Sequence, residues 1–120
     1  MYIIKTGHKP VPTRRASRKQ EDRVAKVLKG KVQSNSGATD FQKGDVVTEN
    51  MLIECKTVMK PQKSVTIQKE WFTKNEVERF QMRKDYSALV FDFGDEDTQY
   101  IAMDLKTFER ILLDKEAEYG

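Results

Sequence analysis

A chain of 120 residues has room for one domain with one hydrophobic core, and its single cysteine excludes an intramolecular disulfide. Apolar residues make up 38% of the chain and charged residues 34%, which indicates a globular protein with a heavily solvated surface. The net charge is +3. No apolar run has the length of a membrane span or a signal peptide, and the single cysteine suits a reducing compartment, so we expect an intracellular, cytoplasmic protein with no membrane partner.

The positive charge is concentrated at the N-terminus. Residues 1–20 hold six basic side chains and no acidic one, so the remaining hundred residues sum to −3. A basic arm on such a body often contacts phosphate backbones, because each cation that reaches a phosphate releases condensed counterions. We expect residues 1–16 to form an irregular basic arm ahead of a domain over residues 17–120, although a solvated tail without a ligand fits the same composition. The expected DNA contacts in this region are Arg14, Arg15, Arg18 and Lys19.

The apolar pattern predicts alternating helices and strands along the rest of the chain. Apolar residues at helical spacing predict helices over residues 17–29, 69–84 and 105–113. Ser17 and Asp104 are the expected N-caps of the first and last of them. Apolar runs bounded by polar turns predict strands over residues 31–33, 45–48, 51–58, 87–93 and 99–103. The order α-β-β-β-α-β-β-α predicts an α/β fold with a mixed five-stranded sheet flanked by helices.

The second and third predicted strands carry the residues that suit catalysis. Side chains alternate along a strand, so Glu54 and Lys56 share one face while Ile53 and Cys55 share the other. Asp45 opens the neighbouring strand of the same hairpin, where its carboxylate can converge on Glu54. Two carboxylates at one point suit Mg²⁺ or Mn²⁺, which polarises a phosphate and lowers the pKa of an attacking water. Lys56 would orient that water, help to deprotonate it, or stabilise the phosphorane.

Glu21 adds a third carboxylate from the first predicted helix. Helical spacing puts it on the same face as Val24 and Leu28, so a charged group occupies the inward apolar stripe. A carboxylate there costs free energy unless a partner, such as a metal or a metal-coordinated water, pairs with it. An acidic first-turn residue that is favoured by the helix dipole accounts for the same pattern.

The order of these residues resembles that of a known nuclease superfamily. Glu21 on a helix, the turn Ser36-Gly37, Gly44-Asp45 at a strand start and Glu54-Cys55-Lys56 follow the pattern of the PD-(D/E)xK nucleases. Within that superfamily the chain looks most like the archaeal-type Holliday junction resolvases, including their phage relatives, over roughly residues 17–93. The resemblance implies a restriction-endonuclease-like fold and a homodimeric, Mg²⁺-dependent endodeoxyribonuclease. Such an enzyme nicks two opposed strands of a four-way DNA junction during recombination and repair.

The resemblance also implies roles for the metal-binding residues. It implies that Asp45, Glu54 and the main-chain carbonyl of Cys55 hold the metal. Glu21 would act on that metal directly or through water, and Lys56 would be catalytic.

The implied substrate contacts lie at the turn and ahead of the second helix. Ser36 would contact DNA near the scissile phosphate, with Gly37 beside it, and Gln68 matches a glutamine found after the Glu-x-Lys strand in many members. Gly44 departs from the pattern, since many members have proline there. The short hairpin and compact chain favour a phage or mobile-element origin in a bacterial or archaeal host.

Two other functions fit the same residues. The chain could be another nuclease of the superfamily, specific for flaps, mismatches or duplex DNA, or a DNA-binding module whose carboxylates are inert. His8 is the only histidine and lies in the basic arm, which argues against histidine-dependent nucleases and Ser-His or Cys-His catalysis. Cys55 is expected as a packed core thiol and the acidic run at residues 95–97 as a solvated turn. No Gly-rich phosphate loop is present, so we expect no nucleotide cofactor.

Overall fold

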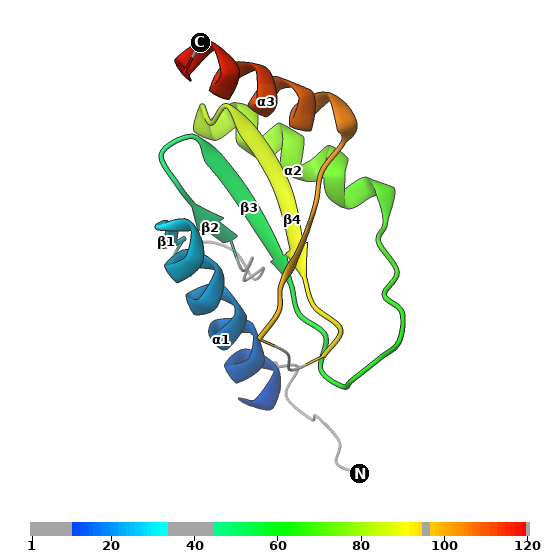
Figure 1. The fold of residues 1–120 in the computed structure, drawn as a ribbon. Coiled ribbons are helices and arrows are strands. Elements are labelled where there is room, and N and C mark those ends of the chain that lie inside the picture. The colour runs from blue at the N-terminus through cyan, green and yellow to red at the C-terminus, as the bar shows by residue number, and fades with distance from the viewer. Residues whose placement is uncertain (1–10, 34–44, 95–96, 120) are drawn as a thin grey trace.

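The computed structural model describes residues 11–33, 45–94 and 97–119, and its elements are shown in Figure 1. The elements in chain order are α1 (Val11–Leu28), β1 (Lys31–Val32), β2 (Asp45–Val47), β3 (Met51–Lys56), α2 (Lys69–Met82), β4 (Tyr86–Phe91), β5 (Tyr100–Ala102) and α3 (Leu105–Tyr119). The fold is α/β, with a mixed five-stranded sheet and three helices among the described residues, as the apolar pattern predicts. None of these described helices is both long and apolar enough to cross a membrane.

The sheet has the strand order β1-β2-β3-β4-β5. Neighbouring strands are antiparallel except β3 and β4, which run parallel over six residue pairs from Met51–Tyr86 to Lys56–Phe91. Parallel neighbours need a long connection, and here the chain makes it through α2. In this strand order β3 is the central strand, with its hairpin partner β2 on one side and β4 on the other.

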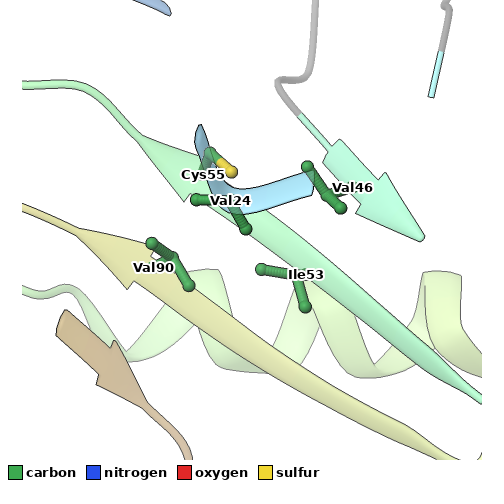
Figure 2. Packing of buried hydrophobic residues seen from close by; sticks show 5 residues of the cluster. All are labelled: Val24, Val46, Ile53, Cys55 and Val90. Atoms are coloured by element: carbon green, nitrogen blue, oxygen red, sulfur yellow. The ribbon is translucent and has the colours of Figure 1, made fainter. Parts of the chain in front are cut away.

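Helices α1 and α2 cover opposite faces of the sheet (Figure 1). On one face, Val24 of α1 packs against Val46 of β2, Ile53 and Cys55 of β3, and Val90 of β4 (Figure 2). These side chains are nearly inaccessible to water, and burying each large aliphatic one contributes about 1.5–3 kcal/mol. Alternation along β3 turns Glu54 and Lys56 to the other face, toward α2.

Helix α1 begins at Val11, so residues 11–16 are helical where we predicted an irregular arm. Pro12 is compatible with this start because a first-turn residue needs no intrahelical N–H partner and proline already has a helical φ. Ser17 is therefore not the N-cap that we predicted: its hydroxyl lies within hydrogen-bond distance of the Thr57 hydroxyl, at 3.1 Å. Residues 1–10 lie outside the described part of the chain.

Helix α3 runs to Tyr119, six residues beyond its predicted end. The apolar spacing that supported the prediction stops at Leu113, but the helix continues through residues 114–119, which include the good helix formers lysine, glutamate and alanine. Asp104 is the N-cap that the sequence predicts, since its carboxylate accepts hydrogen bonds from the main-chain N–H and the hydroxyl of Thr107. The hydroxyl contact is the main reason why the pKa of Asp104 lies below its ordinary value.

Helix α1 ends in a tight turn against the hairpin. Lys29 takes the left-handed conformation with φ 57°, and the N–H of Gly30 donates to the Ala25 carbonyl at 2.8 Å. A Cβ atom on Gly30 would lie 2.7 Å from the Val47 carbonyl oxygen of β2. Glycine is therefore required at residue 30 by the close approach of the two backbones.

We expect Gly30→Ala to lower the free energy of unfolding by about 1–3 kcal/mol, because the turn and β2 must move apart. The neighbouring change Lys29→Gly is the matched control. It should raise the same free energy by about 1 kcal/mol, because glycine adopts a positive φ without strain. Urea denaturation of both variants measures the effect, and equal shifts would contradict this explanation of the turn.

Candidate metal centre

Asp45 and Glu54 lie directly opposite each other on the β2–β3 hairpin. Both side chains are buried, with 5% and 7% of their surface exposed. The hairpin is closed at residues 48–51, where the Thr48 N–H donates to the Met51 carbonyl and the Met51 N–H donates to the Thr48 hydroxyl, each at 3.0 Å. A slip of one residue in this register would turn Asp45 to the opposite face from Glu54, so the tight turn is what keeps the two carboxylates together.

A third carboxylate reaches the same place from α2. One ligand oxygen from each of Asp45, Glu54 and Glu78 can be chosen so that all three lie within 4.8 Å of one another. Sequence analysis did not predict Glu78. Its spacing alone could not have indicated it, because the residue of α2 that is buried against the sheet, three positions earlier, is the polar Asn75, whose side-chain amide donates to the Ala88 carbonyl at 3.0 Å.

Lys56 lies at the edge of this carboxylate cluster, defined here as Asp45, Glu54 and Glu78. Its ammonium is 2.7 Å from a carboxylate oxygen of Glu54 and 4.1 Å from the centre of the Trp71 ring on α2. These two contacts hold the ammonium in position. The Lys56 side chain is still 29% exposed, so solvent reaches it. A cation in this position can contact an anion that approaches the carboxylate cluster from outside.

The pKa of the buried Cys55 thiol is affected by the acidic side chains of this region. Burial raises the pKa of Cys55, and the charges of Glu21, Asp45 and Glu54 raise it further. Glu21 is half-buried on α1, so the structure brings this predicted residue close enough to act on the same sulfur atom. The thiol packs in the core, as expected, and its main-chain carbonyl, the other predicted ligand, directly follows Glu54 on β3.

Gln20, which the sequence analysis missed, fixes α1 to the end of β3. It is 2% exposed, and its side-chain amide donates to the main-chain carbonyl of Lys56 at 2.8 Å and to the Gln99 side chain at 3.0 Å. Its side-chain oxygen accepts from the Thr57 hydroxyl at 2.9 Å. Gln20 precedes Val24 by four residues, so the helical spacing could have placed it on the inward face.

We expect Gln20→Leu to lower the free energy of unfolding by about 1–3 kcal/mol, because Thr57 and the Lys56 carbonyl would be left buried with fewer partners. Arg18→Leu, on the exposed side of the same helix, should change it by less than about 0.5 kcal/mol. Chemical denaturation of both variants tests this, and equal effects would show that the Gln20 contacts do not stabilise the fold.

The predicted DNA contacts are distributed over several parts of the chain. Arg15, Arg18 and Lys19 are exposed on the first half of α1. Two of these cations, Arg15 and Lys19, line a cavity of about 320 Å³ together with Arg23, which also pairs with the exposed Asp97 at 3.1 Å. Gln68 directly precedes α2 and is exposed. Ser36, Gly37 and Gly44, which belong to the resemblance, lie outside the described residues. The side chain of Arg14, a predicted DNA contact, also lies outside the described part of the structure.

The cluster offers only carboxylate oxygen, which is the donor set preferred by Mg²⁺ and Mn²⁺. The whole chain has one histidine and one cysteine, so it cannot assemble a nitrogen and sulfur site of the zinc type by itself. The residues present therefore fit the cofactor that the sequence predicts. Comparisons of the chain with protein families, with curated proteins and with solved structures found no match.

Proposed function

We propose that this protein is a Mg²⁺- or Mn²⁺-dependent DNA endonuclease with a restriction-endonuclease-like domain, and that its substrate is a four-way DNA junction. One observation carries the proposal: Asp45 and Glu54 face each other across the hairpin, with Glu78 in reach of both and Lys56 paired to Glu54. Two buried carboxylates suit a hard divalent cation, and a partly exposed ammonium beside them suits a phosphate, so the three groups fit metal-assisted phosphodiester hydrolysis.

Each residue of the centre has a separate task in this proposal. Asp45 and Glu54 would hold the cation, together with the main-chain carbonyl of Cys55, and Glu78 offers a further oxygen. When bound, the cation would supply a Lewis acid for the scissile phosphate and lower the pKa of the attacking water. Lys56 would orient that water or stabilise the charge that develops on the phosphate. Its contact with the Trp71 ring supports this task, because an ammonium that is already positioned needs little rearrangement in the transition state.

Glu21 lies on α1 and is not a member of the carboxylate cluster. Its charge raises the pKa of the Cys55 thiol together with the charges of Asp45 and Glu54, which supports a role beside the ligand set. We infer that Glu21 acts through water on the bound cation. This is one of the two roles that the resemblance implies for it.

The exposed cations of α1 would bind the DNA backbone. Arg15, Arg18 and Lys19 lie on the helix that Gln20 fixes to the end of β3, so the basic face and Lys56 have a fixed relation. Phosphates bound along α1 would therefore be held at a constant distance from the carboxylate cluster. Ser36, Gly37 and Gln68 are the further contacts that the resemblance proposes.

We expect the apparent junction affinity to fall steeply with salt, and neutralising Arg14, Arg15 and Arg18 to flatten that dependence. The slope of log K against log salt should drop by about 0.9 for each phosphate that the variant no longer binds. Lys115→Gln on α3 is the control and should leave the slope unchanged. An unchanged slope in the triple variant would mean that these arginines do not contact phosphates.

The four-way junction is proposed from the family resemblance and from the need for paired cuts. One centre cuts one strand, so two symmetric nicks require a homodimer with two centres. An enzyme with this activity would act in DNA recombination and repair. The alternatives are a flap, mismatch or duplex nuclease of the same superfamily and a DNA-binding module without catalysis.

The test is cleavage of a synthetic four-way junction, a flap and a linear duplex by the same preparation, with Mg²⁺ or with EDTA. The proposal expects paired nicks in the junction, little cutting of the duplex and no cutting in EDTA. Preferred cutting of the flap or duplex would replace the substrate while keeping the nuclease. Junction binding without cleavage under any divalent cation would leave only the binding module.

A further inference from the structure

The outward face of α3 is apolar, although it is not covered by any described part of the protein. Four large side chains on this helix are highly exposed: Leu105 at 80%, Phe108 at 45%, Leu112 at 46% and Leu113 at 56%. Figure 1 shows α3 at the outer edge of the molecule, next to the start of β4. Single exposed apolar residues are common, but four on one side of one helix form a patch of the kind that marks an interface.

The inward face of α3 is held to the sheet by polar contacts. Thr107 is buried, and Asp114 accepts a hydrogen bond from the Tyr86 hydroxyl of β4. The Arg110 guanidinium lies over the same Tyr86 ring and donates to the Asp85 carbonyl. These contacts fix the rotation of α3 about its axis, so the leucines and Phe108 cannot turn inward without breaking them. The exposure of the apolar face is therefore built into the fold.

The apolar face of α3 also carries charges of both signs. The four apolar side chains and three charged ones, Lys106, Glu109 and Glu116, border one open groove on the surface of the helix. Lys106 lies in the first turn and Glu116 near the other end of the helix. The two residues are ten positions apart, which corresponds to about 15 Å along the helix axis.

We propose that the apolar face of α3 binds the same face of a second copy of this chain, with the two α3 helices antiparallel. Antiparallel pairing about a twofold axis brings Lys106 of each copy against Glu116 of the other, so the charge pair forms twice. Parallel pairing would put lysine against lysine and glutamate against glutamate. The leucines and Phe108 supply the apolar centre, and the charges select the orientation.

This pairing names the surface that would join two metal centres for a paired cut, and this connection to cleavage rests on the proposed function. The inference that the chain associates with itself does not rest on the proposed function. Self-association is inferred from the exposure of the leucines and Phe108 and from the complementary charges, whatever the carboxylate cluster does.

The first experiment is the molar mass of the protein in solution by sedimentation equilibrium, with an aspartate placed in the apolar face. The wild-type chain should be a dimer, and Leu112→Asp should weaken the dimer by about tenfold or more, because the interface would bury an unpaired charge. Phe80→Asp is the matched control, since Phe80 is 75% exposed on α2 and lies outside the proposed face. A monomeric wild type, or a dimer weakened only by Phe80→Asp, would overturn the inference.

The second experiment uses the charge pair and needs no change in the apolar face. Lys106→Glu alone places glutamate against glutamate, and Glu116→Lys alone places lysine against lysine, so each variant should dimerise more weakly than wild type. A mixture of the two should form heterodimers with both pairs restored, and the double variant should dimerise like wild type. Both are surface changes, so they remain informative if Leu112→Asp fails to fold. Equal association of the single variants, the mixture and the double variant would overturn the antiparallel pairing.

Failure of the dimer surface can be distinguished from failure of the proposed function. Mn²⁺ should raise the unfolding temperature of wild type, Leu112→Asp and both charge variants alike, because the carboxylate cluster lies within one copy. A monomeric Leu112→Asp that responds to Mn²⁺ and cuts only one strand at a time would support the pairing and its link to paired cleavage. Unchanged paired cleavage by a monomeric variant would break that link.

Discussion

Asp45→Asn and Glu54→Gln are each expected to reduce junction cleavage by about 10³-fold or more, since each removes a charge needed to hold the cation. Junction binding should be largely retained, because the proposed phosphate contacts lie on α1 and not on the hairpin. Single-turnover cleavage with Mg²⁺ and junction binding in EDTA measure the two effects separately. Glu49→Gln is the control: Glu49 is exposed in the turn of the same hairpin, and its loss should leave cleavage unchanged.

Asp45→Asn should also be more stable than wild type when no divalent cation is present. Asp45 is buried beside Glu54 and near Glu78, so neutralising it removes repulsion among like charges. Glu54→Gln, by contrast, would also lose the ion pair with Lys56. The unfolding temperature in EDTA should rise by a few degrees, about the shift that 1 kcal/mol produces in a domain of this size. Mn²⁺ should then stabilise wild type but not the variants. Normal cleavage by Glu54→Gln, or variants that are stabilised by Mn²⁺ like wild type, would contradict a metal centre at this hairpin.

Lys56→Met is expected to lower the cleavage rate by about 10²–10³-fold, through loss of a positioned charge at the reacting phosphate. It should not lower metal affinity. The Lys56 ammonium is 2.7 Å from Glu54 and so competes with a cation for that carboxylate. The Mn²⁺-dependent rise in unfolding temperature should therefore be at least as large in Lys56→Met as in wild type.

This combination separates a catalytic lysine from a structural one. A lysine that only supports the hairpin would give lower stability and weaker metal binding together. Lys74→Met, at an exposed position of α2, is the matched control and should change neither cleavage nor metal binding. If Lys56→Met loses cleavage and the Mn²⁺ response in parallel, the role of Lys56 is to support the site rather than to act on the phosphate.

Helix α2 shows where prediction from the sequence was incomplete. Its position was predicted to within two residues, but the apolar residues Val77 and Phe80, which supported the prediction, are 57% and 75% exposed. The buried residue of this helix is Asn75, which bonds to the Ala88 carbonyl of β4. The apolar residues of α2 are spread around its axis, so periodicity shows that a helix forms but not which side faces the sheet.

The β2–β3 hairpin was determined by the sequence itself. Alternation puts Glu54 and Lys56 on one face, and the short turn after β2 sets the register that places Asp45 opposite Glu54. All these relations are local, because a strand has a period of two and a tight turn leaves few registers. Local sequence alone therefore places three of the proposed active-site residues together.

Contacts between helices and the sheet were decided only by the tertiary structure. Glu78 reaches the hairpin carboxylates from α2, Gln20 bonds to the end of β3 from α1, and the apolar face of α3 is turned away from the protein. Each depends on how a helix is rotated and seated on the sheet, which is fixed by packing and hydrogen bonds between residues far apart in the chain. Helical periodicity leaves that rotation open wherever polar and apolar residues share a face, and so the sequence determined the hairpin while tertiary packing determined what surrounds it.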